Sequence, residues 1–591
     1  MRGAVVQLLR ELFFVHPQNS CQPSHVEPLR AIYGGTLSAP DRTILAIFHL
    51  FEVHKKLSCA SLLSTWSSSG DSCSTDALEA ALSLDAGKVF YTCLNFPRGL
   101  KFDLNHEYYD KSEFRQELYD PLFLNLVFAR AVLGNSPSSV LSWVQFFRTN
   151  IVCVVIRSLS SKDDAFRELA LSNVSGLWKL LEVIGMWSKN LGIFADHLCI
   201  QSADMQEKPH VIYLLNLLRD QIPAPIDGSG PPRLSTYASL ILCHALRGIF
   251  YPSNFIYPLT ARFLLQRAEL DTQDVPMFLG MLYSNSDDNW RRERAWMIRF
   301  LADGMSSAQD WKISRKRHAW DLVASMFQSF TQDHTLRNGI LEVNLFHQRR
   351  RKCDIDIGQF LIKITSNRYG VNSLLLRSGL LPWIEIQVHG AVTEQEASQW
   401  CRVLNNVLTV SDAAKVESVT EGQWRKAIMR IIERFLGMNG ELMSFMSELS
   451  IGDFPLTSAK VSPFVLCESA DLISRLEAVS PGDSDLLRVV GLALKSLDVL
   501  ESNLRVRDDS DDPRPNLRSE ESPEGDPLIL WGKVVVTLWQ VVMGFSTKPT
   551  SWDRLTTRLV IWRCIAGETE VLEGEWARKE AVRNLRSRDD R

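Results

Sequence analysis

Motifs for catalysis and cofactor binding are missing from this sequence of 591 residues. It contains no GxxxxGK[ST] loop, no GxGxxG turn and no GxSxG elbow, so phosphate cradling and serine-hydrolase chemistry have no support. No cluster of titratable residues stands out as an acid–base site. We therefore expect a protein that is not an enzyme, with no catalytic residues, no cofactor and no small-molecule substrate.

Cysteines are few, and no two of them have the spacing of a common metal-binding or redox motif. The 11 cysteines include no CxxC, which argues against a disulfide framework and a zinc ribbon and favours a reducing compartment. The nearest approach to a metal motif is His106-Glu107 followed by Asp110, where an aspartate replaces the second histidine of HExxH. A solvated polar turn explains these residues better, so we expect no metal site.

Long apolar runs and a charge excess of one sign are also missing. The best apolar stretch, Val534 to Phe545, is shorter than the roughly 20 residues of a bilayer span and contains Gln540, so we expect a soluble protein without a membrane partner. The 65 Lys+Arg and 69 Asp+Glu residues give a net charge of −4. Any contact with nucleic acid must therefore come from a local basic patch.

Helical periodicity, in contrast, is present along most of the chain. Apolar residues recur at helical spacing within 40–57, 394–409 and 424–435, whereas alternating strand patterns are nearly absent. Thr420 and Gln423 have the spacing of a capping box in front of the third stripe. The sequence predicts an all-α fold without a sheet of three or more strands.

Two segments have the pattern of helical repeats. Within 163–183, Asp164 is placed to cap a helix and Arg167 to stack between repeats, as in HEAT and armadillo units. Within 363–386, Gly379 and Pro382 suit the end of one helix and the first turn of the next. We expect an armadillo/HEAT-like α-solenoid, with a generic helical domain as the alternative.

Composition suggests where the chain divides. The prolines and glycines of 223–233 predict a linker between an N-terminal helical-repeat segment, 1–222, and an armadillo-like segment, 234–505. The stretch 506–526 is strongly acidic and almost without large apolar side chains, so it should be a disordered linker. Residues 527–591 should form a C-terminal helical segment.

A basic insert interrupts one predicted helix. If 343–359 is removed, the apolar stripe before it continues in phase with Phe360, Leu361 and Ile364. We interpret this insert either as a retained intron in the gene model or as a genuine solvent loop at the edge of a repeat.

The segment 287–352 is the candidate binding site, since it has 13 basic and 8 acidic residues in a chain that is acidic overall. Arg292, Trp296 and Arg299 follow at i, i+4 and i+7, a row that could pair phosphates and stack a base. The alternative is that these arginines pair with neighbouring carboxylates and hold helices together. The candidate RNA-binding residues are Arg291, Arg292, Arg294, Trp296, Arg299, Lys312, Arg315, Lys316 and Arg317.

Several segments between about 119 and 386 resemble one family. LYSNSDDNWRRERAWMIRFLADGM and DWKISRKRHAWDLVASMFQS, together with WVQFFRTNIVCVVIRSLSSKDDAFRELAL and LLLRSGLLPWIE, are similar to the C-terminal region of the nucleolar pre-ribosomal-associated protein 1 family, also called the unhealthy ribosome biogenesis protein. Family chains are much longer, so the resemblance leaves open whether Met1 is the true start.

The resemblance implies a non-enzymatic helical-repeat scaffold of the nucleus and nucleolus. Such a scaffold would join early precursors of the large (60S) ribosomal subunit, organise pre-ribosomal RNA and work with assembly factors that include a helicase-containing assembly. A protein-only armadillo-type adaptor that binds peptides or partner proteins is the alternative. Steep salt dependence of RNA binding would separate the two functions.

Overall fold

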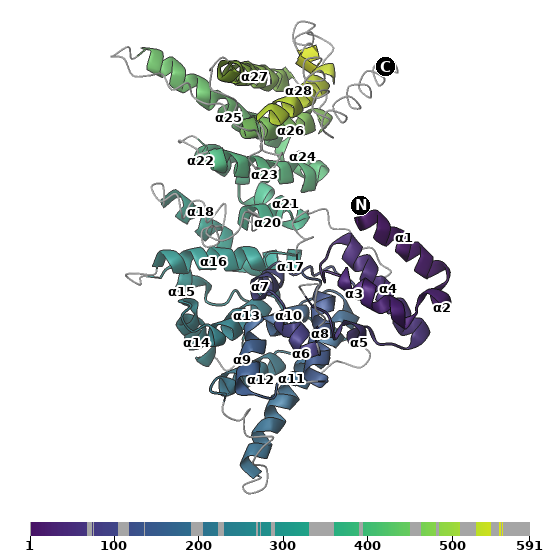
Figure 1. The fold of residues 1–591 in the computed structure, drawn as a ribbon. Coiled ribbons are helices and arrows are strands. Elements are labelled where there is room, and N and C mark those ends of the chain that lie inside the picture. The colour runs from purple at the N-terminus through teal and green to yellow at the C-terminus, as the bar shows by residue number, and fades with distance from the viewer. Residues whose placement is uncertain are drawn as a thin grey trace. The chain divides into compact units, whose positions relative to one another are not determined.

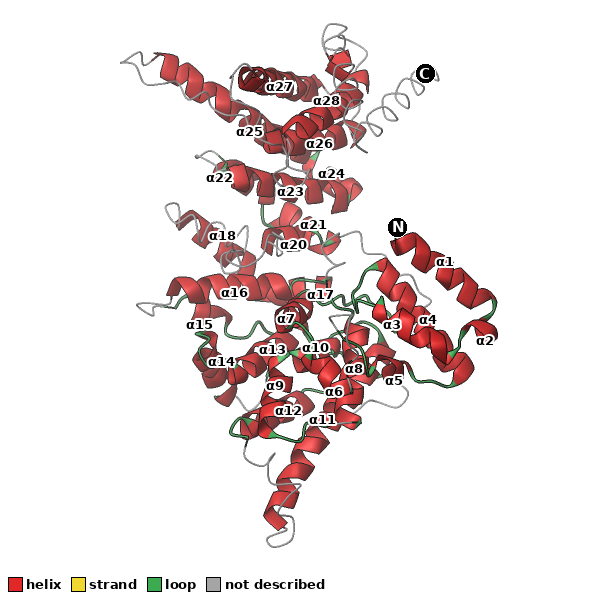
Figure 2. Ribbon diagram, in the orientation of Figure 1, coloured by secondary structure: helices red, strands yellow, loops and turns green. Residues whose placement is uncertain are grey.

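The computed structural model is all-helical in the part of the chain that it describes (Figures 1 and 2). One isolated antiparallel bridge joins Thr36 and Tyr119. The predicted all-α class is therefore confirmed. The described residues are 2–67, 74, 76–103, 118–134, 136–190, 205–222, 230–266, 270–271, 273–284, 290–329, 360–388, 394–448, 463–479, 484–508, 527–544, 555–556 and 558–559.

The chain divides after Trp320 into two compact units. Unit 1 contains the described residues up to Trp320, and unit 2 contains those from Asp321 onward. The predicted 223–233 linker falls within unit 1, where Leu234 N donates to Leu159 O at 3.1 Å. The segment boundaries expected from composition remain predictions.

Unit 1 begins with helices that pack on one apolar face. Helix α1 (Arg2–Val15) packs against α4 (Ala39–Lys55) and buries Val6 and Phe13. The expected stripe of α4 is buried. Between and after them come α2 (Pro17–Ser20), η1 (Pro23–His25), α3 (Val26–Ala31) and α5 (Cys59–Leu63).

Helix α10 (Ile151–Ser158) is the centre of unit 1, and all of its residues are buried. It is apolar on every side because other helices surround it (Figure 1). Its neighbours are α7 (Ala86–Leu94), α8 (Pro121–Leu133), α9 (Val140–Arg148), α11 (Asp164–Asn190) and α13 (Thr236–Phe250). No single helix of the described residues is long and apolar enough to cross a membrane, although the bent pair α9 and α10 passes that test by length and composition together.

The remaining helices of unit 1 pack around this centre. They are α6 (Ala77–Leu82), α12 (Lys208–Asp220), α14 (Ile256–Leu265), α15 (Phe278–Leu282), α16 (Trp290–Gly304) and α17 (Ala308–Lys316). Helix α16 packs on α13 and buries Met297, Phe300 and Leu301. Helix α18 (Ala319–Ser329) begins at the boundary between the units.

In unit 2, three short helices follow one another between 360 and 387. Asn367 follows α20 (Phe360–Thr365) and caps α21 (Arg368–Arg377) by accepting from the amides of Tyr369 and Gly370. Gly379, with φ +59°, then reverses the chain into α22 (Leu380–Gln387). The longer helices follow: α23 (Glu394–Val410), α24 (Ala413–Thr420), α25 (Gln423–Glu448), α26 (Pro463–Val479), α27 (Ser484–Asp508) and α28 (Pro527–Gly544).

Two helix starts differ from the sequence predictions. Thr420 is the last residue of α24 and not a cap, because Glu421 and Gly422 turn the chain with φ +49° and +81° before α25 begins. Asp163, not Asp164, caps α11 by accepting from Phe166 N at 2.9 Å. In both cases a neighbouring residue of suitable chemistry takes the terminal position.

The acidic linker and the insert fall mostly outside the described part of the chain. Helix α27 extends to Asp508, so the first residues of the expected 506–526 linker are helical, and 509–526 lies outside the described residues. The 343–359 insert and His106-Glu107 also lie outside them. Within 527–591, α28 is the principal described helix.

Gly304 allows α16 to pack closely on α13. A Cβ atom at this position would lie 2.1 Å from Cε1 of Tyr237, whose ring is fully buried. We expect Gly304→Ala to lower the free energy of unfolding by about 1–3 kcal/mol, because the buried ring must move. Gly280→Ala is the matched control, since no atom lies within 4 Å of a Cβ there. Equal unfolding midpoints of the two variants in thermal denaturation would contradict this packing.

Candidate nucleic-acid interface

A charged side chain lies at the end of the buried helix α10. Arg157 is 1% exposed, and burial lowers the pKa of its guanidinium. Its Nε donates to Cys93 O at 3.3 Å, and its Nη1 donates to Ser239 Oγ at 2.8 Å and to Thr236 O at 3.3 Å. Neutral oxygens of α7 and α13 thus solvate this buried cation in place of water.

Two more arginines bind the backbone that follows α10. Arg233 Nε donates to Ser160 O at 3.1 Å, and Arg167 Nη1 donates to Ser161 O at 3.0 Å and to Lys162 O at 3.1 Å. Carbonyls beyond a helix C-terminus have no partner within the helix, and cations bind well to the negative end of its dipole. Arg167 Nη2 also donates to Asp164 Oδ1 at 2.6 Å, so Asp164 pairs with an arginine of its own helix and does not cap it.

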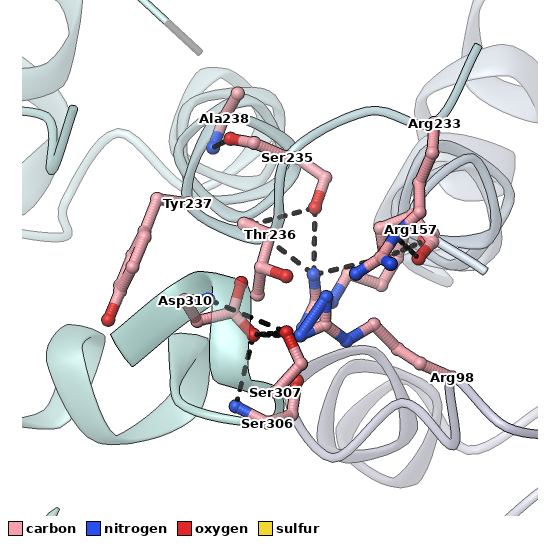
Figure 3. Close-up of polar contacts among 12 residues, drawn as sticks. Arg98, Arg157, Arg233, Ser235, Thr236, Tyr237, Ala238, Ser306, Ser307 and Asp310 are labelled. Atoms are coloured by element: carbon pink, nitrogen blue, oxygen red, sulfur yellow. Dashed lines mark hydrogen bonds and ion pairs between the residues drawn. The ribbon is translucent and has the colours of Figure 1, made fainter. Parts of the chain in front are cut away.

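Asp310 brings helix α17 to this group of arginines (Figure 3). Its carboxylate forms an ion pair with Arg98, and both side chains are almost completely buried. Oδ2 of Asp310 also accepts from Ser307 Oγ at 2.7 Å and from Ser306 N at 3.3 Å. We call Arg98, Arg157, Arg167, Arg233 and Asp310 the α10 polar cluster.

The α10 polar cluster has more positive than negative buried charge. Burial lowers the pKa of Arg98 to about 10, and Asp310 opposes this effect. Nε and Nη1 of Arg98 are buried without a hydrogen-bond partner. Asp310 is consequently the main anion that offsets buried arginine charge here, and it fixes the first turn of α17.

The other face of α17 is basic and exposed. Trp311, Ile313 and Ser314 are buried, whereas Lys312, Arg315 and Lys316 are exposed at i, i+3 and i+4. We call these three exposed residues the α17 basic ridge. Among the predicted RNA-binding residues whose side chains the structure describes, these three form the most exposed group on a single helix face.

Arg317 follows the ridge and has a protein partner. Its Nε and Nη2 each donate to the Asp274 carboxylate at 2.5 Å, and this interaction raises the pKa of Arg317. The side chain is 44% exposed. The two-pronged pair holds its charge at a fixed position beside the ridge.

The predicted row on α16 is divided between surface and interior. Arg292 is exposed above the Phe255 ring, with 5.6 Å from Cζ to the ring centroid. Trp296 is half-buried and stacks on Phe300 at 5.1 Å between centroids. Burial lowers the pKa of half-buried Arg299, with Asp303 acting in the opposite direction. Trp296 and Arg299 are therefore only partly open to solvent.

Arg294 of α16 adds little open surface. Arg294 is half-buried, lies 4.6 Å from the Trp290 ring centroid and donates from Nη2 to Ser284 O at 3.3 Å. The side chain of Arg291 lies outside the described residues. RNA binding by the α16 residues stays a prediction, and α17 offers the more open basic face.

A neutral histidine lies beneath α16. The His244 ring contacts Trp296 edge-on at 5.1 Å and Phe90 at 5.4 Å between centroids. Burial, with the charges of Arg247 and Arg299, lowers the pKa of His244 to about 3. The imidazole is therefore uncharged at neutral pH and packs as an aromatic ring.

The α10 polar cluster was not predicted from the sequence. Apart from Arg167, which the repeat-like pattern singled out, its local signals are Arg157 at the end of an apolar run and Asp310 three residues after the cap Ser307. Both patterns are common at the ends of ordinary helices. The pairing of Arg98 with Asp310 joins residues 212 positions apart, which no local pattern indicates.

The central part of this chain is similar to a known protein family. Residues 152–383, which include α10, α13, α16 and α17, match the family model described as nucleolar pre-ribosomal-associated protein 1. The resemblance predicted from the sequence is therefore confirmed over those residues. No solved structure matches the chain.

Two curated relatives have the same name. The human nucleolar pre-ribosomal-associated protein 1 is 25% identical over 368 residues, which are 58% of this chain and 15% of the human protein. The mouse protein is 25% identical over 364 residues, which are 57% of this chain and 14% of the mouse protein. The matched region is thus a small part of each relative.

The Arg98 and Asp310 pair can be tested by comparing a variant that removes only the anion with a double variant that replaces both charges. We expect Asp310→Asn to lower the free energy of unfolding by about 3–5 kcal/mol, because it leaves buried guanidiniums without their anion. The double variant R98M/D310L should lose less, since it buries no unpaired charge from this pair. Equilibrium urea unfolding measures both.

A second carboxylate on the surface supplies the control. Asp274→Asn removes the partly exposed Arg317 pair and should cost less than about 1 kcal/mol. Equal effects of D310N and D274N on the free energy of unfolding would contradict the claim that the buried Arg98 and Asp310 pair is more important for stability than the partly exposed pair.

Proposed function

We propose that this chain is a non-enzymatic scaffold in the biogenesis of the large (60S) ribosomal subunit in the nucleolus, and that the α17 basic ridge contacts pre-ribosomal RNA. The observation that carries the proposal is the position of the ridge within residues 152–383, the segment that matches the pre-ribosomal-associated family. Both relatives are named as nucleolar, which supports that location.

The scaffold would be an armadillo/HEAT-like α-solenoid. Helices α20, α21 and α22, with Asn367 and Gly379 at their junctions, support an armadillo-like arrangement in unit 2. A stack of helical repeats presents a long, fixed surface. Separate RNA segments and assembly factors bound to such a surface gain effective concentration for one another without any active site.

The electrostatics favour contact with RNA at α17. Lys312, Arg315 and Lys316 place three cations on one exposed face, in a protein whose net charge is −4. Asp310, on the same helix, is buried in the α10 polar cluster, so the ridge is attached to a rigid core. A preformed basic face binds phosphates with a smaller ordering cost than a flexible segment does.

The family resemblance also supplies the proposed partners. Pre-ribosomal RNA and early large-subunit assembly factors, including a helicase-containing assembly, would bind the scaffold together. The name of the relatives, pre-ribosomal-associated, supports assembly partners of this kind. It does not name an enzyme, in agreement with the expectation that the chain performs no catalysis.

Charge reversal of the ridge tests its contact with RNA. In the full chain, K312E/R315E/K316E should weaken binding to a fragment of large-subunit precursor RNA at least tenfold in about 0.1 M salt. For each phosphate that the variant no longer neutralises, the slope of log K against log salt should also fall by about 0.7–0.9, because fewer counterions are released. Fluorescence anisotropy over a salt series measures both quantities.

A matched triple variant controls for net charge. Lys101, Lys179 and Lys415 are exposed and lie outside α17, so K101E/K179E/K415E changes the total charge by the same amount. We expect this variant to keep most of the affinity. If both triple variants weakened RNA binding equally, the ridge would act only through the overall charge of the protein. If the wild-type chain did not bind RNA, a protein-only adaptor would be favoured.

A further inference from the structure

Three side chains with different donor atoms meet where α4 turns into α5. His49 and Glu52 lie at i and i+3 on α4, and Cys59 is the first residue of α5. His49 Nδ1 lies 3.3 Å from Glu52 Oε2. One donor atom from each of the three residues lies within 4.8 Å of the other two. In the described part of the chain, this is the one group of three such residues that meets that criterion.

The backbone brings Cys59 to the two α4 residues. Lys56, with φ +58°, ends α4 and donates from its amide to Glu52 O at 3.1 Å. Leu57 N then donates to Phe51 O at 3.3 Å, and the chain reverses before α5. This reversal is a helix C-terminal turn with a left-handed residue, so local backbone hydrogen bonds hold the position of the cysteine.

The three side chains form a site that is buried on the Cys59 side and exposed to solvent on the His49 and Glu52 side. Cys59 is 5% exposed, whereas the side chains of His49 and Glu52 are 38% and 44% exposed. An ion could therefore approach from solvent past the imidazole and the carboxylate. The buried Cys59 sulfur would then be the third protein ligand, on the side away from solvent.

The donor set matches the preference of one metal ion in particular. Zn²⁺ binds thiolate sulfur, imidazole nitrogen and carboxylate oxygen, whereas Mg²⁺ and Ca²⁺ prefer oxygen alone. Bonds of about 2.0–2.3 Å in a tetrahedron imply distances of about 3.3–3.7 Å between ligand atoms. The distance from His49 to Glu52 is already of that size, and small rotations would bring in Cys59.

We propose that His49, Glu52 and Cys59 form a Zn²⁺ site with three protein ligands and a fourth position for water. The ion would join the end of α4 to the start of α5 and stabilise the turn between them. Binding transfers the Cys59 thiol proton to solvent and forms the zinc–sulfur bond. This site is independent of the proposed contact with RNA, because α17 contributes nothing to it.

Metal titration of the full chain tests the site. The reduced, chelator-treated protein is titrated with Zn²⁺ against a chromophoric chelator and, separately, with Co²⁺. We expect one equivalent of Zn²⁺ to bind and Co²⁺ to produce a thiolate-to-metal charge-transfer band. Cys59→Ser should abolish the band and weaken Zn²⁺ binding at least 100-fold.

The variants of the exposed ligands keep the test decisive if Cys59→Ser fails to fold. His49→Gln and Glu52→Gln alter partly exposed side chains and should each weaken Zn²⁺ binding at least tenfold. His54→Gln is the matched control, since His54 is exposed on the same helix but outside the group. It should bind Zn²⁺ like the wild type.

Two results would overturn the proposal. One is a wild-type chain that gives no charge-transfer band with Co²⁺. The other is Zn²⁺ binding by H49Q and E52Q that equals that of the wild type and of H54Q. Either result would leave the three residues as a hydrogen-bonded group only.

Discussion

The burial of Arg157 at the end of α10 is the constraint on which the centre of unit 1 depends. A guanidinium cannot lose its hydration without replacement partners, and its position at the end of a fully buried helix leaves only protein atoms to supply them. Oxygens of α7 and α13 meet this requirement. The helices around α10 are thereby fixed by polar geometry as well as by apolar packing.

Asp310 extends the same constraint to the surface. Its pairing with Arg98 anchors α17, and the helix then presents Lys312, Arg315 and Lys316 on its outer face. A buried ion pair contributes little net stability compared with apolar packing, but it restricts which arrangements are allowed. In this protein the restriction sets the orientation of a basic helix, the feature that the proposed RNA contact needs.

Local sequence patterns predicted the helices and their apolar faces. The stripe of α4 and the turn at Gly379 follow from spacing and backbone preference, which act over a few residues. The predicted capping of α25 was wrong because Gly422, with φ +81°, allows a tighter turn than Thr420 would give. The spacing of apolar residues thus predicted buried faces, whereas it did not identify the residues at the starts of α11 and α25.

The candidate sites depend on contacts that spacing does not reveal. Charge and helical period placed Trp296 in an RNA-binding row, but the partners that half-bury it, His244 and Phe300, belong to the tertiary packing. The Arg98 and Asp310 pair joins distant segments for the same reason. The group of His49, Glu52 and Cys59 was missed because its third member follows a turn and does not form a familiar metal motif.

Crosslinking of the tagged full chain to RNA in living cells, followed by sequencing of the bound RNA, tests the central claim most directly. We expect precursor RNA of the large ribosomal subunit to be enriched, and the enrichment to fall when Lys312, Arg315 and Lys316 are replaced by glutamate. Recovery of no pre-ribosomal RNA above the level of an untagged control would contradict the proposed function.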